Sequence, residues 1–313
     1  MNQSEPTKIL IVGAGISGLV LAKRLSPKFQ STLLEKSRGV GGRIATRRKE
    51  SGAWDHGIPF LSKHDVPESL WNTWKPFLKE IPNSDSSCFA APHGLTELAK
   101  NLAADLKIIK EYRVNQISFQ KKGSPWKLTD ENQKEYFGDL VVLAIPVPQA
   151  IELLRSSLFF NELKLAPLLE PISYSSQLVL LGISDPFPEA NPEVFSVHNP
   201  FERVINNGRK GILKSDAFFT AYLTPAFSQE HFNDPPEILL PFLQETLSKD
   251  YGILASHLEL KKWRYSQCLN PSSQSFAQGS PPYDSLFCIG DGFSEGGFRG
   301  ALESALALAA RLS

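Results

Sequence analysis

The sequence predicts a mixed α/β fold with two domains, and three observations support this prediction. Residues 9–12 form a short β-branched apolar run, typical of a buried parallel strand, and a glycine-rich turn and a helical pattern follow at once. Residues 161–282 show alternating strand patterns separated by prolines and polar turns, which indicates an antiparallel sheet. A final strand and helix, residues 284–312, return the chain to the domain in which it began.

The first expected element is a βαβ unit that begins at Lys8. Gly13 allows a tight turn, Gly15 lets the backbone approach a pyrophosphate, and Gly18 lets the helix lie close to the strand. The second strand ends at Glu35, where a carboxylate can accept both hydroxyls of an adenosine ribose and disfavours a 2′-phosphate. We therefore expect a dinucleotide site here, the alternative being a tight turn without a nucleotide.

A second glycine loop, residues 39–43, follows the acidic residue directly and selects among dinucleotides. A nicotinamide dehydrogenase has no use for it, whereas the longer flavin cofactor FAD can have its pyrophosphate held from two sides. Arg43, between glycines and a strand-like segment, is expected on the phosphate side. The basic run at residues 47–49 has a solvated charged face as its alternative explanation. The other cofactor contacts that we expect around these two loops are Ile16, Ser17, Lys36, Arg38 and Gly42.

The segment after the second loop, residues 55–61, is expected to carry backbone past the flavin ring, although a simple strand and turn would have the same pattern. Its expected cofactor contacts are His56, Gly57, Ile58 and Pro59. Phe60 would supply an aromatic wall for the substrate.

Two aromatic segments are candidates for substrate binding. Residues 67–82 have an aromatic helical pattern that includes Trp71, for which buried core is the simpler explanation and a pocket lid the alternative. Trp263 and Arg264 suit a planar, phosphate-bearing substrate, although Trp263 can equally pack against the sheet.

The carboxyl-terminal segment indicates the same cofactor. A short strand leads into Gly290 and Asp291, and Asp291 can bond a ribityl hydroxyl. A small-residue helix follows, and its amino terminus near Gly300 and Ala301 would direct its dipole at the flavin edge that gains negative charge on reduction. Three further cofactor contacts are expected from other expected strands and from this helix: Val114, Ala144 and Phe298.

Composition excludes several classes of function. The 313 residues carry no formal net charge, so nothing suggests a nucleic-acid or acidic-membrane partner. No apolar run approaches the length that spans a bilayer, and no signal segment precedes the first strand, so we expect a cytoplasmic protein. The 3 cysteines and 6 histidines lack metal-site spacing, and we expect no metal.

Four motifs resemble those of the amine-oxidase superfamily of FAD enzymes, and within it the renalases. They are GAGISGL (residues 13–19), EKSRGVGGR (35–43), DHGIPFL (55–61) and GDGFSEGGFRGALESAL (290–306). The similarity extends over the whole chain. One departure is that Ile58 and Pro59 stand where renalase-like proteins usually have Ala-Gln.

The resemblance implies an oxidase of misreduced nicotinamides. Such enzymes take a hydride from 2- or 6-dihydro isomers of NAD(P)H to flavin N5, release NAD(P)+ and pass the electrons to O2 as H2O2. Two alternatives stay open: a flavin amine or polyamine oxidase, and a redox-neutral flavin isomerase or FAD-binding protein without turnover. Cys268 and Cys288 are poorly placed for covalent attachment, so FAD is expected to be non-covalent, in a monomer or weak homodimer.

These motifs also predict the domain boundaries. We expect a Rossmann-type, GR2-like FAD-binding domain and a second α+β substrate domain built on an antiparallel sheet. The FAD-binding domain would comprise residues 1–62, 88–155 and 283–313, and the substrate domain residues 63–87 and 156–282.

Overall fold

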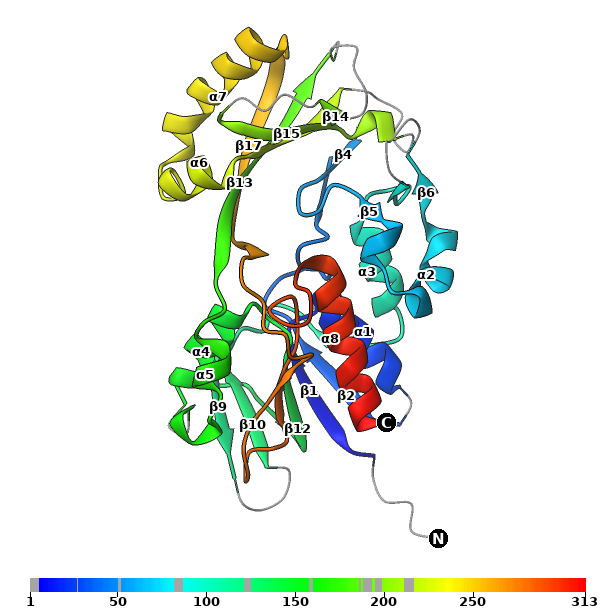
Figure 1. Ribbon diagram of the computed structural model, residues 1–313, viewed down its shortest axis with the longest axis vertical. Helices are drawn as coiled ribbons and strands as arrows, with labels where there is room; N and C mark the ends of the chain where they lie inside the picture. Colours follow the sequence, from blue (N-terminus) through cyan, green and yellow to red (C-terminus); the bar gives the residue numbers. More distant parts are fainter. Residues whose placement is uncertain are drawn as a thin grey trace. The chain divides into compact units, whose positions relative to one another are not determined.

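The computed structural model describes residues 6–26, 28–49, 52–81, 87–120, 125–157, 160–185, 187, 193–194, 199–210 and 217–313. The chain divides into two units, which we name after their main sheets (Figure 1). The parallel-sheet unit comprises residues 1–42, 99–173 and 268–313. The antiparallel-sheet unit comprises residues 43–98 and 174–267.

A six-stranded sheet forms the centre of the parallel-sheet unit, in the order β18-β19-β12-β1-β2-β8. All neighbouring pairs in it are parallel except β18 with β19. Ile9 and Ile11 on one face of β1 are 0% exposed and Leu10 on the other face is 2% exposed, because a central parallel strand is covered on both faces. The strands are β1 (Lys8–Val12), β2 (Gln30–Leu34), β8 (Lys107–Ile109), β12 (Leu140–Leu143), β18 (Ala277–Gln278) and β19 (Leu286–Cys288).

Helices and a smaller sheet complete this unit. The first and last helices, α1 (Ile16–Leu25) and α8 (Gly297–Leu312), pack against each other. A three-stranded antiparallel sheet lies between β8 and β12 in the chain. Its strands are β9 (Val114–Phe119), β10 (Trp126–Asp130) and β11 (Glu135–Gly138), and the other helical elements of the unit are α4 (Val147–Arg155), η3 (Phe160–Leu163) and α5 (Ala166–Leu169).

A five-stranded sheet in the order β14-β15-β16-β13-β17 forms the second unit. Its strands are β13 (Tyr174–Ser184), β14 (Glu193–Val194), β15 (Phe201–Asn206), β16 (Phe218–Leu223) and β17 (Ala255–Cys268). The helical elements that follow β15 and β16 are η4 (Gly208–Lys210), α6 (Pro225–Glu230) and α7 (Pro236–Tyr251). One buried cluster joins the sheet to α6 and α7 through Phe227, Leu239 and Leu243.

The other face of this sheet packs against a segment from earlier in the chain. Trp54 is fully buried there with Val179, Leu181 and Phe218. The elements of that earlier segment are β3 (Thr46–Lys49), β4 (Gly52–Asp55), β5 (Leu61–Ser62), η1 (Lys63–Asp65), α2 (Glu68–Trp74), η2 (Lys75–Phe77), β6 (Lys79–Glu80) and β7 (Cys88–Ala90). Helix α3 (Thr96–Ala103) carries the chain from this unit back to the parallel-sheet unit.

The predicted fold class is confirmed, while two details differ. The helix expected over residues 67–82 ends as α-helix at Trp74, because Pro76 lacks an N–H and disfavours a helical residue before it. Residues 43–62 and 88–98, which we expected in the FAD-binding domain, lie in the antiparallel-sheet unit, since Asp55 bonds to side chains of the five-stranded sheet. The assignment of a cofactor domain and a substrate domain stays a prediction.

Candidate functional site

The first glycine turn leaves an open surface between β1 and α1. Gly13 has φ +101°, a conformation that glycine adopts readily, and its N–H donates to the Leu34 carbonyl at 2.8 Å. A Cβ on Gly18 would lie 2.3 Å from the Gly13 carbonyl oxygen, so only glycine lets α1 approach this closely. A Cβ on Gly15, in contrast, would meet no protein atom within 4 Å. The structure therefore has room at Gly15 for a ligand.

Glu35 stands beside this opening with its carboxylate already oriented. One oxygen accepts the Ala14 N–H and the other accepts the Ser37 N–H, each at 2.8 Å. Each carboxylate oxygen can accept a second hydrogen bond, so the pair of ribose hydroxyls predicted from the sequence has two acceptors here. The residue is 8% exposed and therefore buried.

The second glycine loop packs on the first. The Gly41 N–H donates to the Ala14 carbonyl at 2.8 Å, and Gly41 forms a parallel bridge with Gly15. A Cβ on Gly42 would lie 3.3 Å from the Gly15 Cα. The structure thus brings together the two loops that we expect to hold one pyrophosphate.

The helix start and the basic residues of these loops differ in exposure. Ile16 and Ser17 are buried in the first turn of α1, whose first N–H groups have no partner within the helix. Lys36 is exposed, and Arg38 is 91% exposed and pairs with Glu111 at 3.0 Å.

The carboxyl-terminal loop lies next to the same sheet. It follows β19, and the Gly290 N–H donates to the Ser304 hydroxyl of α8 at 3.2 Å. Asp291 is 3% exposed. The helix begins at Gly297, earlier than predicted, because Gly296 at φ +76° makes the turn into it. The Gly300 N–H already bonds the Gly296 carbonyl at 2.7 Å, so the first helical N–H groups belong to residues 297–299, and not to Gly300 and Ala301.

Three predicted contacts outside the glycine loops have different positions. The Ala144 carbonyl oxygen would lie 2.6 Å from a Cβ on Gly13, so Ala144 forms part of the glycine turn's surroundings. Val114 begins β9 in the smaller sheet, and Phe298 lies in the first turn of α8. Their contact with a cofactor stays a prediction.

These features of the parallel-sheet unit fit FAD. The open surface at Gly15 would accept a phosphate group beside the helix start, and the Glu35 carboxylate would match a ribose diol. When bound, FAD supplies a two-electron acceptor, and the residues of the two loops would hold its adenosine diphosphate half.

In the antiparallel-sheet unit, Arg43 holds strand β17 with its guanidinium group. Its Nη1 donates to the Ser266 carbonyl at 3.0 Å, and the guanidinium lies 5.9 Å from the Tyr174 ring centroid. The Arg43 carbonyl accepts the Ile58 N–H at 2.9 Å, and a Cβ on Gly57 would lie 1.7 Å from that carbonyl oxygen. Glycine is therefore required at position 57 for the turn to pack against Arg43.

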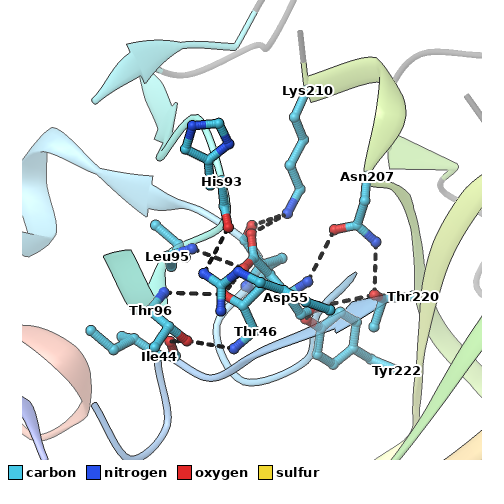
Figure 2. A network of polar contacts seen from close by, with 12 residues as sticks. Ile44, Thr46, Asp55, His93, Leu95, Thr96, Asn207, Lys210, Thr220 and Tyr222 are labelled. Atoms are coloured by element: carbon cyan, nitrogen blue, oxygen red, sulfur yellow. Dashed lines mark hydrogen bonds and ion pairs between the residues drawn. The ribbon is translucent and has the colours of Figure 1, made fainter. Parts of the chain in front are cut away.

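Asp55 is the centre of a buried polar network (Figure 2). Its Oδ1 accepts the Thr46 hydroxyl at 2.7 Å and the Leu95 N–H at 2.9 Å, and its Oδ2 pairs with Lys210 at 3.0 Å. Its backbone carbonyl accepts the Thr220 hydroxyl at 2.9 Å and the Tyr222 hydroxyl at 3.3 Å.

The neighbours of Asp55 are themselves ordered by this network. The Asp55 N–H donates to Asn207 Oδ1 at 3.3 Å, and the Asn207 amide donates to the Thr220 hydroxyl at 2.9 Å. Burial, together with the Asp55 charge, raises the pKa of Tyr222 well above its usual value, so its phenol stays protonated and donates.

His56 and Trp263 form a flat pair next to this network. Their ring centroids are 5.5 Å apart with an interplanar angle of 27°, and Trp263 Nε1 donates to the His56 carbonyl at 2.7 Å. Nδ1 of His56 is buried and has no hydrogen-bond partner among the residues that the structure describes. A bound ligand can provide one.

The imidazole of His56 is neutral at pH 7. Burial lowers its pKa to about 4, and the charges of Lys261 and Arg47 act in the same direction, against Asp55 and Glu259. The ring therefore offers Nδ1 as either a donor or an acceptor, according to its tautomer.

Of the predicted substrate residues, Phe60 and Trp263 pack against the same buried cluster around Trp54, whereas Trp71 and Arg264 have other neighbours. Trp71 is 4% exposed and packs edge-on against Phe89, with centroids 4.8 Å apart, so it is part of the core. Phe60 packs partly buried beside Trp54, with the Arg203 guanidinium 5.8 Å from its ring centroid. Arg264 is exposed and lies over Phe232, and because side chains alternate along β17 it faces away from Trp263.

Sequence reasoning missed Lys210, Asn207 and Thr220. Residues 206–210 have the composition of an exposed polar turn, yet Asn207 is 2% and Lys210 1% exposed. Their burial depends on a carboxylate more than 150 positions earlier, since Asp55 and Lys210 are 155 residues apart. No local pattern could have revealed this pair.

Two negative findings hold for the described part of the chain. It contains no group of three His, Cys, Asp or Glu side chains arranged to hold a metal ion. None of its helices has both the length and the apolar character needed to cross a bilayer.

Comparisons with known protein families match the chain along most of its length. Residues 11–77 match the profile of an NAD(P)-binding Rossmann-like domain. Residues 71–313 match the profile of flavin containing amine oxidoreductases.

Individual relatives agree with these profiles. Renalase of Mus musculus is 25% identical and aligns over 96% of this chain and 97% of its own length. An L-amino-acid oxidase of Mus musculus is 33% identical over a segment that covers 29% of this chain and 15% of the oxidase. A crystal structure of a protein described as a protoporphyrinogen oxidase from Exiguobacterium sp. 255-15 superposes with a TM-score of 0.75 over 99% of both chains at 14% identity, which shows a shared fold.

The glycine turn, Glu35 and the second glycine loop thus lie within the part of the chain that matches the Rossmann-like profile. The chain belongs to the flavin containing amine oxidoreductase family, and it is an FAD-dependent oxidoreductase.

Proposed function

We propose that the protein oxidises 2- or 6-dihydro isomers of NAD(P)H to NAD(P)+. The substrate gives a hydride to flavin N5, and O2 takes up two electrons and two protons to leave as H2O2. The observation that carries this proposal is the similarity to renalase, which extends over 96% of this chain and 97% of the relative. The L-amino-acid oxidase similarity covers only 29% of the chain and supports an amine substrate less well.

The proposed hydride transfer does not require a strong base. A misreduced dihydropyridine becomes an aromatic pyridinium when it loses hydride, so the protein needs to position the ring and exclude water. Burial lowers the pKa of His56 to about 4, so its imidazole is neutral at pH 7 and is a weak base. We therefore assign no general base.

The flat pair of His56 and Trp263 suits a nicotinamide. Aromatic faces stack on a planar ring, and a neutral imidazole can donate to or accept from a carboxamide. Ile58 and Pro59 supply no polar side chain to this turn; the Ile58 N–H bonds Arg43, and the Pro59 carbonyl accepts from Lys210. In this proposal His56 takes over the orientation of the carboxamide.

The test is anaerobic mixing of the FAD-loaded protein with borohydride-generated NADH isomers while the oxidised-flavin band is followed. We expect rapid, saturable bleaching by the isomer mixture, slow or no bleaching by ordinary 4-dihydro NADH, and peroxide when air is readmitted. Parallel mixing with putrescine, a monoamine and an L-amino acid tests the amine alternative.

Each outcome distinguishes the candidate functions. Bleaching by an amine alone would contradict the proposal and favour an amine oxidase. A yellow protein that no donor bleaches would indicate an isomerase or a protein that holds FAD without turnover.

We further propose that FAD is held without a covalent bond. Cys288 is 1% exposed, and burial raises its thiol pKa to about 12, which disfavours the thiolate needed for attachment. Cys88 and Cys268 are also buried. Acid precipitation should release all flavin into the supernatant; yellow colour retained in the washed pellet would contradict this.

A further inference from the structure

The buried ion pair of Asp55 and Lys210 is not explained by the cofactor or the substrate. Its two charged atoms are 3.0 Å apart, and the side chains are 1% (Lys210) and 2% (Asp55) exposed. Removing two charges from water costs about as much as their attraction returns, so a buried pair is weak evidence of added stability. A second role is needed to account for its presence.

Without the lysine, neutral donors still hold one oxygen of the Asp55 carboxylate. Thr46 and Leu95 both donate to Oδ1, and Lys210 alone contacts Oδ2 among the described residues. The network that holds Asp55 in the unit therefore has several neutral members (Figure 2).

Lys210 also makes a bond that no other member of the network makes. Its Nζ donates to the Pro59 carbonyl at 2.5 Å. The ammonium group thus joins a side chain at position 55 to a backbone carbonyl at position 59, across the turn that contains His56 and Gly57.

The rest of this turn is held on its backbone. The His56 N–H donates to the Ala45 carbonyl at 3.0 Å, the Ile58 N–H donates to Arg43 at 2.9 Å, and Trp263 donates to the His56 carbonyl. These bonds act on residues 56–58, so Lys210 holds the end of the turn that they leave out.

We propose that Lys210 is a positioning residue of the cofactor site, which holds the Pro59 carbonyl to the Asp55 carboxylate and thereby orients the turn of residues 55–59. This inference rests on the prediction that the turn lies along the flavin, and it is independent of the substrate. A shift of the turn would change the flavin's surroundings as well as the affinity for FAD.

The test compares Lys210→Met with the double variant Asp55→Asn, Lys210→Met. The single variant leaves a buried carboxylate without its cation, whereas the double variant removes both charges. We expect both variants to bind FAD about tenfold more weakly and to shift the visible band of the bound flavin, since both lose the bond to Pro59. The melting temperature should fall in the single variant and recover largely in the double variant.

A merely structural pair would behave differently. If FAD affinity and the flavin spectrum recover together with the melting temperature in the double variant, the proposal is overturned. Lys249→Met, which breaks an exposed pair with Glu245, is the matched control and should change neither quantity.

Gly57→Ala separates this inference from the site prediction on which it rests. An added Cβ would collide with the Arg43 carbonyl and displace the turn directly. If Gly57→Ala binds FAD more weakly and the double variant binds it normally, only the proposed role of Lys210 is refuted. If both variants bind FAD normally, the predicted position of the turn along the flavin is refuted, and the proposal fails with it. If neither methionine variant folds, Lys210→Arg decides, because it keeps the charge with a different shape: wild-type FAD affinity there overturns the proposal.

Discussion

The candidate sites in the two units of this protein consist of different chemical groups. In the parallel-sheet unit, the site at Gly15 consists of backbone that glycines leave uncovered, beside one carboxylate held by backbone N–H groups. In the antiparallel-sheet unit, the site around Asp55 consists of buried side chains from several strands and loops. The site at Gly15 depends on the absence of side chains, whereas the site around Asp55 depends on the hydrogen-bond and ion-pair partners of its side chains.

This difference predicts how each site fails. A side chain added to the glycine loops blocks a ligand or forces the helix from the strand, while most of the unit's core is untouched. A side chain removed from the Asp55 network leaves a polar group buried without its partner, which lowers stability before any ligand is considered.

Gly18→Ala is expected to have the largest effect on FAD binding. The added Cβ would lie 2.3 Å from the Gly13 carbonyl oxygen and 3.2 Å from the Ala144 Cβ, so α1 has to move away from β1. Overpacking of this kind costs at least about 1–3 kcal/mol and also displaces the N–H groups at the helix start. We expect a lower melting temperature for the apoprotein and no FAD in the purified protein, measured as flavin absorbance per chain.

Gly15→Ala is the matched control within the same turn. Its Cβ would meet no protein atom within 4 Å, so the apoprotein should melt as the wild type does while FAD binding weakens. Equal loss of apoprotein stability in both variants would show that the opening at Gly15 is not a ligand site.

In the other unit, Lys210→Met should lower the free energy of unfolding by about 3–5 kcal/mol, because it leaves the Asp55 carboxylate buried without its cation. Thr220→Val removes a neutral donor to the Asp55 carbonyl, which Tyr222 still contacts, and the acceptor of the Asn207 amide, and should cost about 1–3 kcal/mol. Urea denaturation of the two apoproteins measures both values. Similar losses would mean that the charge of Lys210 contributes nothing beyond a neutral hydrogen bond.

The pH dependence of stability tests the burial of His56. Its pKa is 6.5 in an unfolded chain and about 4 in the folded protein, so the unfolded state binds the proton more readily. The contribution is fully present above pH 6.5 and is lost as the pH falls towards 4, by about 2 kcal/mol between pH 7 and pH 4.5. His56→Phe keeps an aromatic ring against Trp263 and cannot titrate, so its unfolding free energy should fall less than that of the wild type over this range. Parallel curves for the two proteins would contradict a lowered pKa.

The smallest effect is expected at the exposed pair of Glu245 and Lys249 on α7. Their side chains are 60% and 70% exposed, and water and salt screen such pairs. Lys249→Met should leave the melting temperature unchanged within error, at low and at high salt. A clear fall in the melting temperature that depends on salt would show that this exposed ion pair stabilises the antiparallel-sheet unit.

Much of the parallel-sheet unit could be predicted because its signals are local. The strand at residues 9–12, the glycine spacing and Glu35 lie within one short stretch, and hydrophobic period and turn chemistry determine their structure. Helix α8 begins three residues before the predicted start at Gly300, because Gly296 at φ +76° makes the turn into it, and hydrophobic periodicity does not reveal such a turn.

Prediction was weaker wherever side chains from distant strands meet. Trp263 and Arg264 are neighbours in sequence, but the alternation of β17 sends them to opposite faces. Trp71 has the pattern of either a pocket wall or a core residue, and its packing against Phe89 could be seen only in the folded chain.

The sequence by itself determined the fold class, the dinucleotide motif and the flavin family, because each depends on residues close together in the chain whose backbone conformation is set locally. Only the tertiary structure decided that Asp55 and Lys210 form a pair, that Arg43 bonds to strand β17 and that Nδ1 of His56 is buried in a ring with a lowered pKa. The physical reason is that burial and charge pairing are properties of the assembled core, where partners as far apart as 155 positions come within hydrogen-bonding distance.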